Sequence, residues 1–205
     1  SVKQLTEKPA EPKSDLALVG VYMFDKSIFD AVKSIRPSFR NELEITDAIQ
    51  WLIDHGLRVH PHVVKGWWKD TGKIDDMLEA NRTVLDTFER DVATEIDPNS
   101  AIEGKVIVEK GAQISDSVIR GPVIIGAGAV IRHAFVGPYT SIGTGCIIEY
   151  CEIENSIVLE RSTISHVDGR IEASLIGRNV RIGKTRRKPT AYRFMLGDNS
   201  EVGIT

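Results

Sequence analysis

The sequence has few cysteines, no long apolar run and little net charge. Its two cysteines, Cys146 and Cys151, lack the paired spacing of a zinc site, so we expect free thiols in a reducing, cytoplasmic environment. No apolar run approaches the roughly 18 residues of a membrane-spanning helix, and the first residues lack the apolar core of a signal peptide. A formal net charge of −3 gives no general reason to expect nucleic acid or an acidic membrane as a partner.

The second half of the sequence repeats at an interval of seventeen residues. Branched aliphatic residues keep this interval in three series: Ile102, Ile119, Val136, Ile153; Val108, Ile125, Ile142; and Ile114, Ile131, Ile148. Each repeat divides into steps of six, six and five residues, each bringing one aliphatic side chain inward. This pattern is typical of a parallel β-helix, in which three short strands per coil enclose an apolar axis.

The later repeats are less regular. The inward series continues with Val158, Ile164, Ile171, Ile176 and Ile182, but the interval becomes eighteen residues. We attribute the change to one extra residue at a corner near 167–169. Glycines follow inward residues at bends where a Cβ would be crowded or the backbone needs positive φ: Gly126, Gly137, Gly143, Gly177 and Gly183. The alternative, an antiparallel sandwich, is disfavoured because Asn-Gly and Asp-Gly hairpin turns are almost absent.

The first half, residues 1–95, is expected to be α/β. The expected elements are a strand at 16–24, a short helix from Asp25 or Ser27 to Ile35, a helix at 44–55, a strand at 57–64 and a helix at 73–90. The run at 16–24 is apolar throughout, as in a strand buried on both faces. Asp97-Pro98-Asn99 then separates this half from the coils at 100–184, and residues 185–205 form a C-terminal extension.

Three polar segments of the first half stand out: Glu7-Lys8-Pro9, Arg40 to Asp47, and Gly66 to Gly72. The last one joins a predicted strand to a helix, and ligands of open α/β sheets bind at such strand ends. Each segment also has a structural explanation: a solvated ion pair, charges that complement a helix dipole, or a helix N-cap.

In order and spacing, these segments resemble the latter half of the catalytic domain of a sugar-phosphate nucleotidyltransferase. The resemblance is carried by Glu7-Lys8-Pro9, Leu16 to Tyr22, Asn41 to Asp47 and Trp68 to Gly72, and is greatest to long-form glucose-1-phosphate thymidylyltransferases. In that family a left-handed β-helix follows the catalytic domain. The resemblance implies that the complete enzyme couples glucose 1-phosphate to dTTP, giving dTDP-glucose and pyrophosphate, with related sugars or UTP left open.

The resemblance also assigns site residues. It implies substrate contacts from Glu7, Lys8, Leu18, Gly20 and Glu42, and a Mg²⁺ ligand at Asp70. Glu7 would accept hydrogen bonds from sugar hydroxyls, Lys8 would face the sugar phosphate, and Asp70 would hold a metal that bridges phosphates. No catalytic side chain is assigned in this chain, because the family works mostly by alignment and charge neutralisation.

The sequence departs from the family in one respect. Family members begin with a glycine-rich loop containing Gly-Thr-Arg, which grips the triphosphate, and carry a further metal-binding Asp upstream of the segment that matches Glu7. Residues 1–205 contain neither. We therefore expect that the sequence is part of a longer polypeptide and that this chain alone is inactive.

Two other functions are compatible with the coils. Hexapeptide coils also form acyltransferases that use a histidine as general base, and His133 and His166 are the candidates in the coil region. Alternatively, the coils serve assembly without catalysis, because flat coil faces and exposed terminal coils are natural docking surfaces. For either the enzyme or the assembly module we expect a homo-oligomer.

Overall fold

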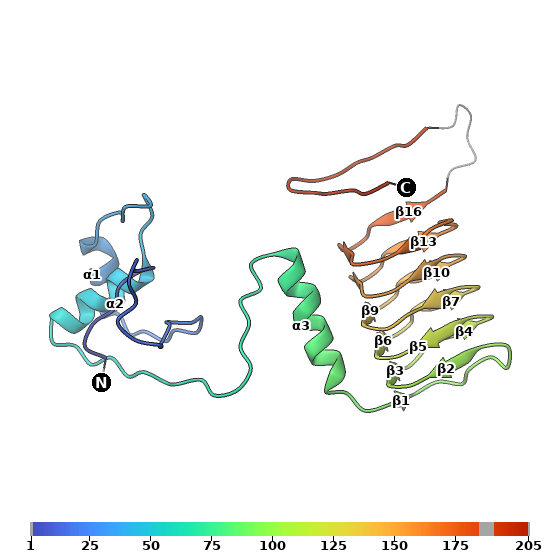
Figure 1. The fold of residues 1–205 in the computed structure, drawn as a ribbon, viewed down its shortest axis with the longest axis horizontal. Coiled ribbons are helices and arrows are strands. Elements are labelled where there is room, and N and C mark those ends of the chain that lie inside the picture. The colour runs from blue at the N-terminus through green and yellow to red at the C-terminus, as the bar shows by residue number, and fades with distance from the viewer. Residues whose placement is uncertain (1, 185–190, 205) are drawn as a thin grey trace. The chain divides into compact units, whose positions relative to one another are not determined.

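The computed structural model describes residues 2–184 and 191–204, so residues 185–190 of the predicted C-terminal extension lie outside the described residues. The chain divides into two compact units, Ser1–Trp68 and Lys69–Thr205, both drawn in Figure 1. None of the helices in the described ranges has the length and apolar content that crossing a bilayer requires.

The first unit contains two helices, α1 (Ser27–Ser34) and α2 (Ile45–Asp54), as the sequence predicted. They pack through Ala31, Ala48 and Leu52, which are buried. The Asp25 carboxylate accepts a hydrogen bond of 2.9 Å from the backbone N–H of Ser27, so Asp25 satisfies a donor at the start of α1. The small alanines allow the two helices to approach closely.

The prediction of two strands in the first unit is wrong. Neither 16–24 nor 57–64 forms a strand in the described part of the chain. Val21 and Met23 are 90% and 95% exposed, although the apolar run predicted burial on both faces. An extended segment becomes a strand only when a neighbour pairs with its backbone, and residues 2–68 supply no such neighbour.

Helix α3 (Ile74–Asp86) confirms the third predicted helix, and it belongs to the second unit. The Asn81 side chain donates to the backbone O of Tyr139 (2.9 Å) and accepts from the Ser141 hydroxyl (2.6 Å), while Lys105 Nζ donates to Asp86 O at 2.9 Å. Figure 1 shows α3 beside the coils. That the catalytic portion of the protein ends near residue 95 stays a prediction.

The remainder of the second unit is a stack of coils made from short parallel strands. The strands are β1 (Asp91–Val92), β2 (Ala101–Glu103), β3 (Val106–Val108), β4 (Gln113–Ser115), β5 (Val118–Arg120), β6 (Val123–Ile125), β7 (Val130–Arg132), β8 (Phe135–Val136), β9 (Thr140–Ile142), β10 (Ile147–Glu149), β11 (Glu152–Ile153), β12 (Ile157–Val158), β13 (Thr163–Ser165), β14 (Arg170–Ile171), β15 (Leu175–Ile176) and β16 (Arg181–Gly183). They form three sheets, ordered β1-β3-β6-β9-β12-β15, β16-β13-β10-β7-β4 and β14-β11-β8-β5-β2.

The register of the strands confirms the predicted repeat. Ile102, Ile119, Val136, Ile153 and Ile171 are successive partners along one sheet, and the other two series behave in the same way. Ile119, Val136 and Ile153 have no exposed surface. Parallel strands stacked in this way are consistent with the left-handed β-helix that the resemblance implied. The stack starts earlier than predicted, because β1 pairs with β3.

The irregular later coils correct one detail. Val158 pairs with Ile142 after sixteen residues and with Ile176 after eighteen. The step from Ile164 to Ile171 is two residues longer than its earlier counterparts, and the step from Ile153 to Val158 is one residue shorter. The predicted single insertion near 167–169 is therefore an insertion of two residues, partly offset by a one-residue deletion two steps earlier.

Crowding explains the glycines at the bends. A Cβ on Gly126 would lie 2.6 Å from the backbone N of Thr144, and a Cβ on Gly143 would lie 2.8 Å from the backbone N of Glu160. The five predicted bend glycines do not have positive φ. Close approach of the next coil, and not a left-handed backbone, is therefore the reason for glycine at these two positions.

Candidate functional site

The polar cluster of the first unit is centred on Arg40. Its guanidinium lies 3.6 Å from Glu7 Oε1, 2.8 Å from Glu42 Oε2 and 3.4 Å from Glu44 Oε1. We call these four residues the Arg40 cluster. Because Glu44 directly precedes α2, the start of this helix positions one side of the cluster, and three carboxylates share one cation.

Helix α2 holds Glu7 in place. The Thr46 hydroxyl donates to Glu7 Oε2 at 2.8 Å, and the backbone N–H of Leu5 donates to Gln50 Oε1 at 2.6 Å. The N-terminal segment is thus fixed along two successive turns of the helix. The Glu7 side chain keeps 22% of its surface exposed, which leaves lone pairs for an external donor.

Glu44 has a different role in the cluster. It is only 8% exposed, and the Ser38 hydroxyl donates to its Oε1 at 2.8 Å. A carboxylate with such little exposure needs these partners, because an unpaired buried charge is costly. Glu44 therefore stabilises the start of α2, whereas Glu7 and the exposed Glu42 can contact a ligand.

The other predicted substrate residues lie elsewhere in the first unit. Lys8 is exposed and has φ of 37°, which turns the chain away after Glu7. Leu18 is 42% exposed, and Gly20 has open space on its Cβ side. No hydrogen bond or ion pair among the described residues joins Leu18 or Gly20 to the Arg40 cluster. The structure thus brings together Glu7 and Glu42, and the assignments of all five stay predictions.

Asp70, the predicted magnesium ligand, is exposed and belongs to the second unit. The described residues contain no group of three His, Cys, Asp or Glu side chains that could hold a metal ion. Mg²⁺ is commonly held by one or two carboxylates together with substrate phosphates. Asp70 would be one such ligand, with phosphates and a further carboxylate completing the site, and its assignment stays a prediction.

The neighbour of Asp70, Lys69, is occupied by ion pairs within the same unit. Its ammonium lies 2.6 Å from Glu79 Oε2 and 3.1 Å from Asp76 Oδ1. The hydrogen bonds that Lys69 donates to Glu79 and, with a smaller effect, to Asp76 raise the pKa of Lys69. These contacts tie the segment before α3 to the first turns of the helix.

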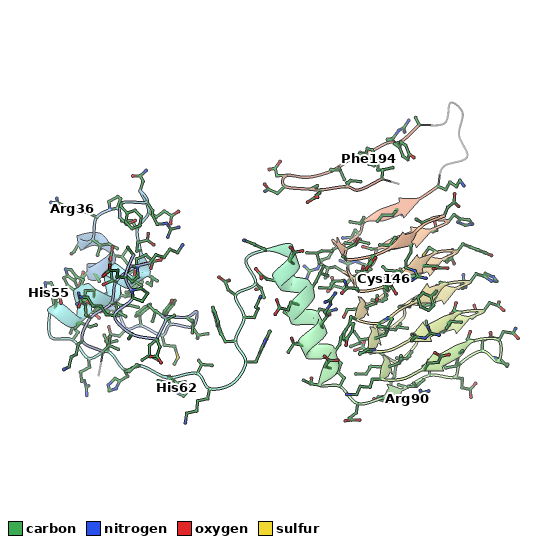
Figure 2. All side chains as sticks on the ribbon, in the orientation of Figure 1. Arg36, His55, His62, Arg90, Cys146 and Phe194 are labelled. Carbon is green, nitrogen blue, oxygen red and sulfur yellow. The ribbon has the colours of Figure 1, made fainter. Side chains whose placement is uncertain are left out.

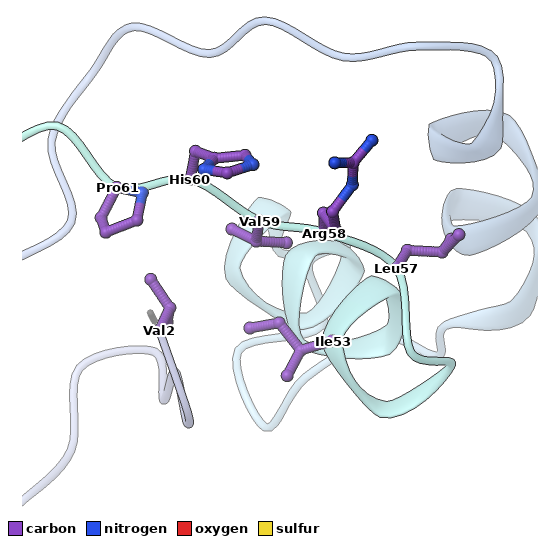
Figure 3. Close-up of a pocket in the computed structure, with 7 residues that line it drawn as sticks. All are labelled: Val2, Ile53, Leu57, Arg58, Val59, His60 and Pro61. Carbon is purple, nitrogen blue, oxygen red and sulfur yellow. The ribbon is translucent and has the colours of Figure 1, made fainter.

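A pocket of about 410 Å³ lies near the other end of α2 (Figure 3). Its walls are mostly apolar: Val2, Ile53, Leu57, Arg58, Val59, His60 and Pro61. None of the predicted site residues lines it. Thr46 belongs to the first turn of α2 and Ile53 to the last, so the pocket and the Arg40 cluster are separate features of this unit.

The candidate histidines of the coils stack on one tyrosine. The ring centroids of His133 and His166 lie 4.6 Å and 4.7 Å from that of Tyr150, with interplanar angles of 20° and 26°. Asp116 Oδ2 lies 3.9 Å from His133 Nε2. The four side chains form a column along one corner of successive coils. Stacking accounts for both histidines without a catalytic role.

Both cysteines are free thiols, as predicted. Cys146, labelled in Figure 2, donates to the backbone O of Leu159 at 3.2 Å. Burial raises the pKa of Cys146 and raises that of Cys151 to about 11. Thiols that hold their protons so firmly are poor nucleophiles, so the cysteines serve packing in the coils.

Comparison with known proteins identifies the first part of the chain. Residues 1–87 match the family described as nucleotidyl transferase, and residues 119–203 match the GMPPB C-terminal domain. This finding and the relatives below confirm the resemblance that Glu7-Lys8-Pro9 and the later motifs indicated.

The relatives have similar sequences over nearly the whole chain. Glucose-1-phosphate thymidylyltransferase from Streptomyces griseus is 52% identical over 201 residues, which are 98% of this chain and 56% of that protein. The enzyme of the same name from Streptomyces antibioticus is 52% identical over 200 residues, with the same coverage. A low-salt glycan biosynthesis nucleotidyltransferase from Haloferax volcanii is 44% identical and covers all of this chain and 58% of that protein. The chain thus spans little more than half the length of these relatives.

Sequence reasoning missed Arg40 as a partner of Glu7 and Glu42, and Thr46 as a partner of Glu7. Arg40 and Thr46 lie more than thirty residues after Glu7, and no spacing rule connects them. The one available signal was that Arg40 is the only cation in a segment with four acids, Glu42, Glu44, Asp47 and, further along the helix, Asp54.

Proposed function

We propose that this chain is the sugar-phosphate-binding part of a glucose-1-phosphate thymidylyltransferase. The complete polypeptide would couple glucose 1-phosphate to dTTP, giving dTDP-glucose and pyrophosphate with Mg²⁺. The observation that carries the proposal is the 52% identity, over 98% of the chain, with the enzyme of that name from Streptomyces griseus. The sequence motifs agree with this similarity, because they contain the residues to which the family assigns sugar binding.

The geometry of the Arg40 cluster supports the role of Glu7. Thr46 and Arg40 each contact one oxygen of its carboxylate, so its orientation is fixed before a ligand arrives. A fixed acceptor for sugar hydroxyls aligns the sugar phosphate for attack on the α-phosphorus of the triphosphate. In this proposal Lys8 places its charge at the sugar phosphate, Leu18 and Gly20 line the sugar, and Mg²⁺, held in part by Asp70, neutralises phosphate charge.

Binding of the sugar phosphate tests this role. Isothermal titration of the 205-residue chain with glucose 1-phosphate is expected to show binding, and Glu7→Gln is expected to weaken it about tenfold by removing a charged acceptor. Glu11→Gln, a change at an exposed neighbouring carboxylate, is the matched control. Equal affinities of the Glu7 and Glu11 variants would contradict the assignment of Glu7.

In our proposal, turnover also requires the glycine-rich loop with Gly-Thr-Arg that grips the triphosphate. No such loop occurs in the 205 residues of this chain. With dTTP, glucose 1-phosphate and Mg²⁺, we expect no release of pyrophosphate from the chain alone. Release is expected when the portion of the Streptomyces griseus enzyme outside the matched range is joined to it. Turnover by the chain alone at the rate of the joined protein would refute this division of labour.

The acyltransferase alternative is not supported by a specific observation, since His133 and His166 are accounted for by stacking on Tyr150. Homo-oligomerisation and assembly through the coils stay predictions. Light scattering at working concentration tests both, and a strictly monomeric protein would exclude them.

A further inference from the structure

The C-terminal segment repeats the sequence of the last coil. Ile176 to Gly183 reads Ile-Gly-Arg-Asn-Val-Arg-Ile-Gly, and Leu196 to Gly203 reads Leu-Gly-Asp-Asn-Ser-Glu-Val-Gly. At an interval of twenty residues, both glycines and the asparagine are identical, and the two inward aliphatic positions keep their character. In the coils, this pattern marks the corner after an inward residue and the strand that follows it.

The backbone agrees with the sequence. The earlier coils place a left-handed residue at one equivalent corner: Gly111 (φ 77°), Gly128 (64°), Gly145 (65°), Arg161 (58°) and Asn179 (57°). Asn199 has φ of 56° at the position that matches Asn179, and both asparagines lie in a two-residue turn. Residues 196–203 thus already have the local conformation of a coil corner, without coil neighbours that impose it.

The last coil of the stack is open. Strands β14, β15 and β16 lie at the ends of the three sheets, and no strand follows them in the described residues. Ile182 is only partly buried, whereas its neighbour in the preceding coil, Ile164, has no exposed surface. In the C-terminal segment, Leu196 and Val202 are 57% and 46% exposed. The open last coil and the C-terminal segment therefore both expose apolar surface at matching positions.

The charges also match. Neighbouring coils pair opposite charges at equivalent positions, as in Arg120 Nε with Glu103 Oε2 at 2.9 Å and Arg178 Nε with Glu160 Oε2 at 2.6 Å. The twenty-residue interval would place an acid beside two arginines of the last coil: Asp198 beside Arg178 and Glu201 beside Arg181. The alternation of charge along the stack would thus continue through one more coil.

We infer that residues 196–203 dock on the open end of the β-helix of the same chain, with Leu196 over Ile176 and Val202 over Ile182. The docked segment is an additional coil turn that closes the apolar axis, as terminal caps do in repeat proteins. Docking within one chain is favoured because the interval is only two residues longer than the eighteen of the preceding coil. The match to the GMPPB C-terminal domain also continues to residue 203.

A disulfide trap tests the register. In Arg181→Cys with Glu201→Cys, the two Cα atoms would be about 4.8 Å apart, within the range that a disulfide spans. The control pair is Arg181→Cys with Ser200→Cys, because adjacent residues of a strand point to opposite faces. After mild oxidation, non-reducing electrophoresis separates a crosslink within one chain from one between two chains. The unsubstituted chain, treated in the same way, shows any crosslinks formed by the native Cys146 and Cys151.

The expected result is a crosslink within one chain, formed about tenfold more in the matched pair than in the control pair. A crosslink between two chains would overturn docking in the same chain and show that a second copy receives the segment. Equal yields in the two pairs, or no crosslink in either, would overturn the register. As a second measurement, Arg181→Glu is expected to increase proteolysis within 191–204, and Glu201→Arg in the same chain to reverse that increase.

Discussion

The coils and the first unit differ in where their residues find partners. In the coils, each strand pairs with a strand sixteen to eighteen residues away, and the branched aliphatic residues are buried. In Ser1–Trp68, the helices α1 and α2 pack, but Phe39, Val21 and Met23 remain largely exposed. Apolar content alone does not make a core. An apolar side chain is buried only when other residues of the chain pack against it.

The difference has a physical basis in chain entropy. Closing a loop of about seventeen residues costs little more than closing a shorter one, and the same closure is repeated in each coil. Each new coil then buries its aliphatic residues on the previous one. The predicted strand at 16–24 has no comparable neighbour, so nothing offsets the cost of ordering it. Four pairs of substitutions, in decreasing order of the expected change in stability, test this comparison.

The largest effect is expected in the axis of the coils. Ile131→Ala removes a fully buried side chain between Ile114 and Ile148, and we expect it to lower the free energy of unfolding by about 3 kcal/mol. Phe39→Ala, at a side chain that is 83% exposed, is expected to change it by less than about 0.5 kcal/mol. Urea denaturation followed by far-ultraviolet circular dichroism measures both. Similar losses of unfolding free energy in the two variants would contradict the difference between the buried axis of the coils and the exposed apolar residues of the first unit.

A smaller loss is expected from crowding between coils. Gly126→Ala would place a Cβ 2.6 Å from the backbone N of Thr144, which must shift, so we expect a loss of about 2 kcal/mol. Gly20→Ala in the first unit has nothing within 4 Å and is the matched control, expected to be neutral. Thermal unfolding of both variants measures the difference, and an unchanged midpoint for Gly126→Ala would argue against tight stacking.

The Arg40 cluster gives the largest expected effect on the first unit. Arg40→Met leaves Glu44, which is 8% exposed, without its cation, and we expect this unit to lose about 1.5 kcal/mol. Arg120→Met breaks an exposed pair with Glu103 in the coils and should cost less than about 0.5 kcal/mol. Tryptophan fluorescence, in a background in which Trp67 and Trp68 are replaced by Phe, follows the first variant through Trp51. A stable Arg40 variant would mean that the cluster does not organise α2.

The smallest effect is a gain in stability. Thr140 is fully buried and its hydroxyl has no hydrogen-bond partner among the residues that the structure describes, while Val106 and Val123 occupy the equivalent positions of the preceding coils. Thr140→Val is therefore expected to stabilise the coils by about 1 kcal/mol, and Val123→Thr to destabilise them by a similar amount. Urea midpoints of the two variants check the signs. Stabilisation by Val123→Thr would show that this column tolerates hydroxyls.

The sequence predicted the coils better than the first unit for the same reason. The interval from Ile102 to Ile119 is visible in the sequence and directly sets the strand register. The insertion and deletion around Ile164 and Val158 were missed, although the steps of seven and five residues that contain them are visible in the sequence. The helices α1, α2 and α3 followed from local amphipathic patterns, whereas the strand at 16–24 depended on a partner that no local pattern specifies.

The candidate site was predictable in its residues but not in its contacts. Glu7 and Glu42 were recognised from motifs in their sequence order, and the match of residues 1–87 to the nucleotidyl transferase family agrees with that recognition. Their meeting at Arg40 depends on how the N-terminal segment lies on α2, which only the fold determines. The assignments of Lys8, Leu18 and Gly20 await the binding experiments.

Residue-resolved hydrogen exchange tests the central claim, that partners close in the sequence make the coils the stable part of this chain. We expect amides of β3 to β13 to exchange at least about a thousandfold more slowly than those of residues 16–24 and 57–64. The helices α1 and α2 should be intermediate. Amides of the coils that exchange as fast as those of residues 16–24 would contradict the account.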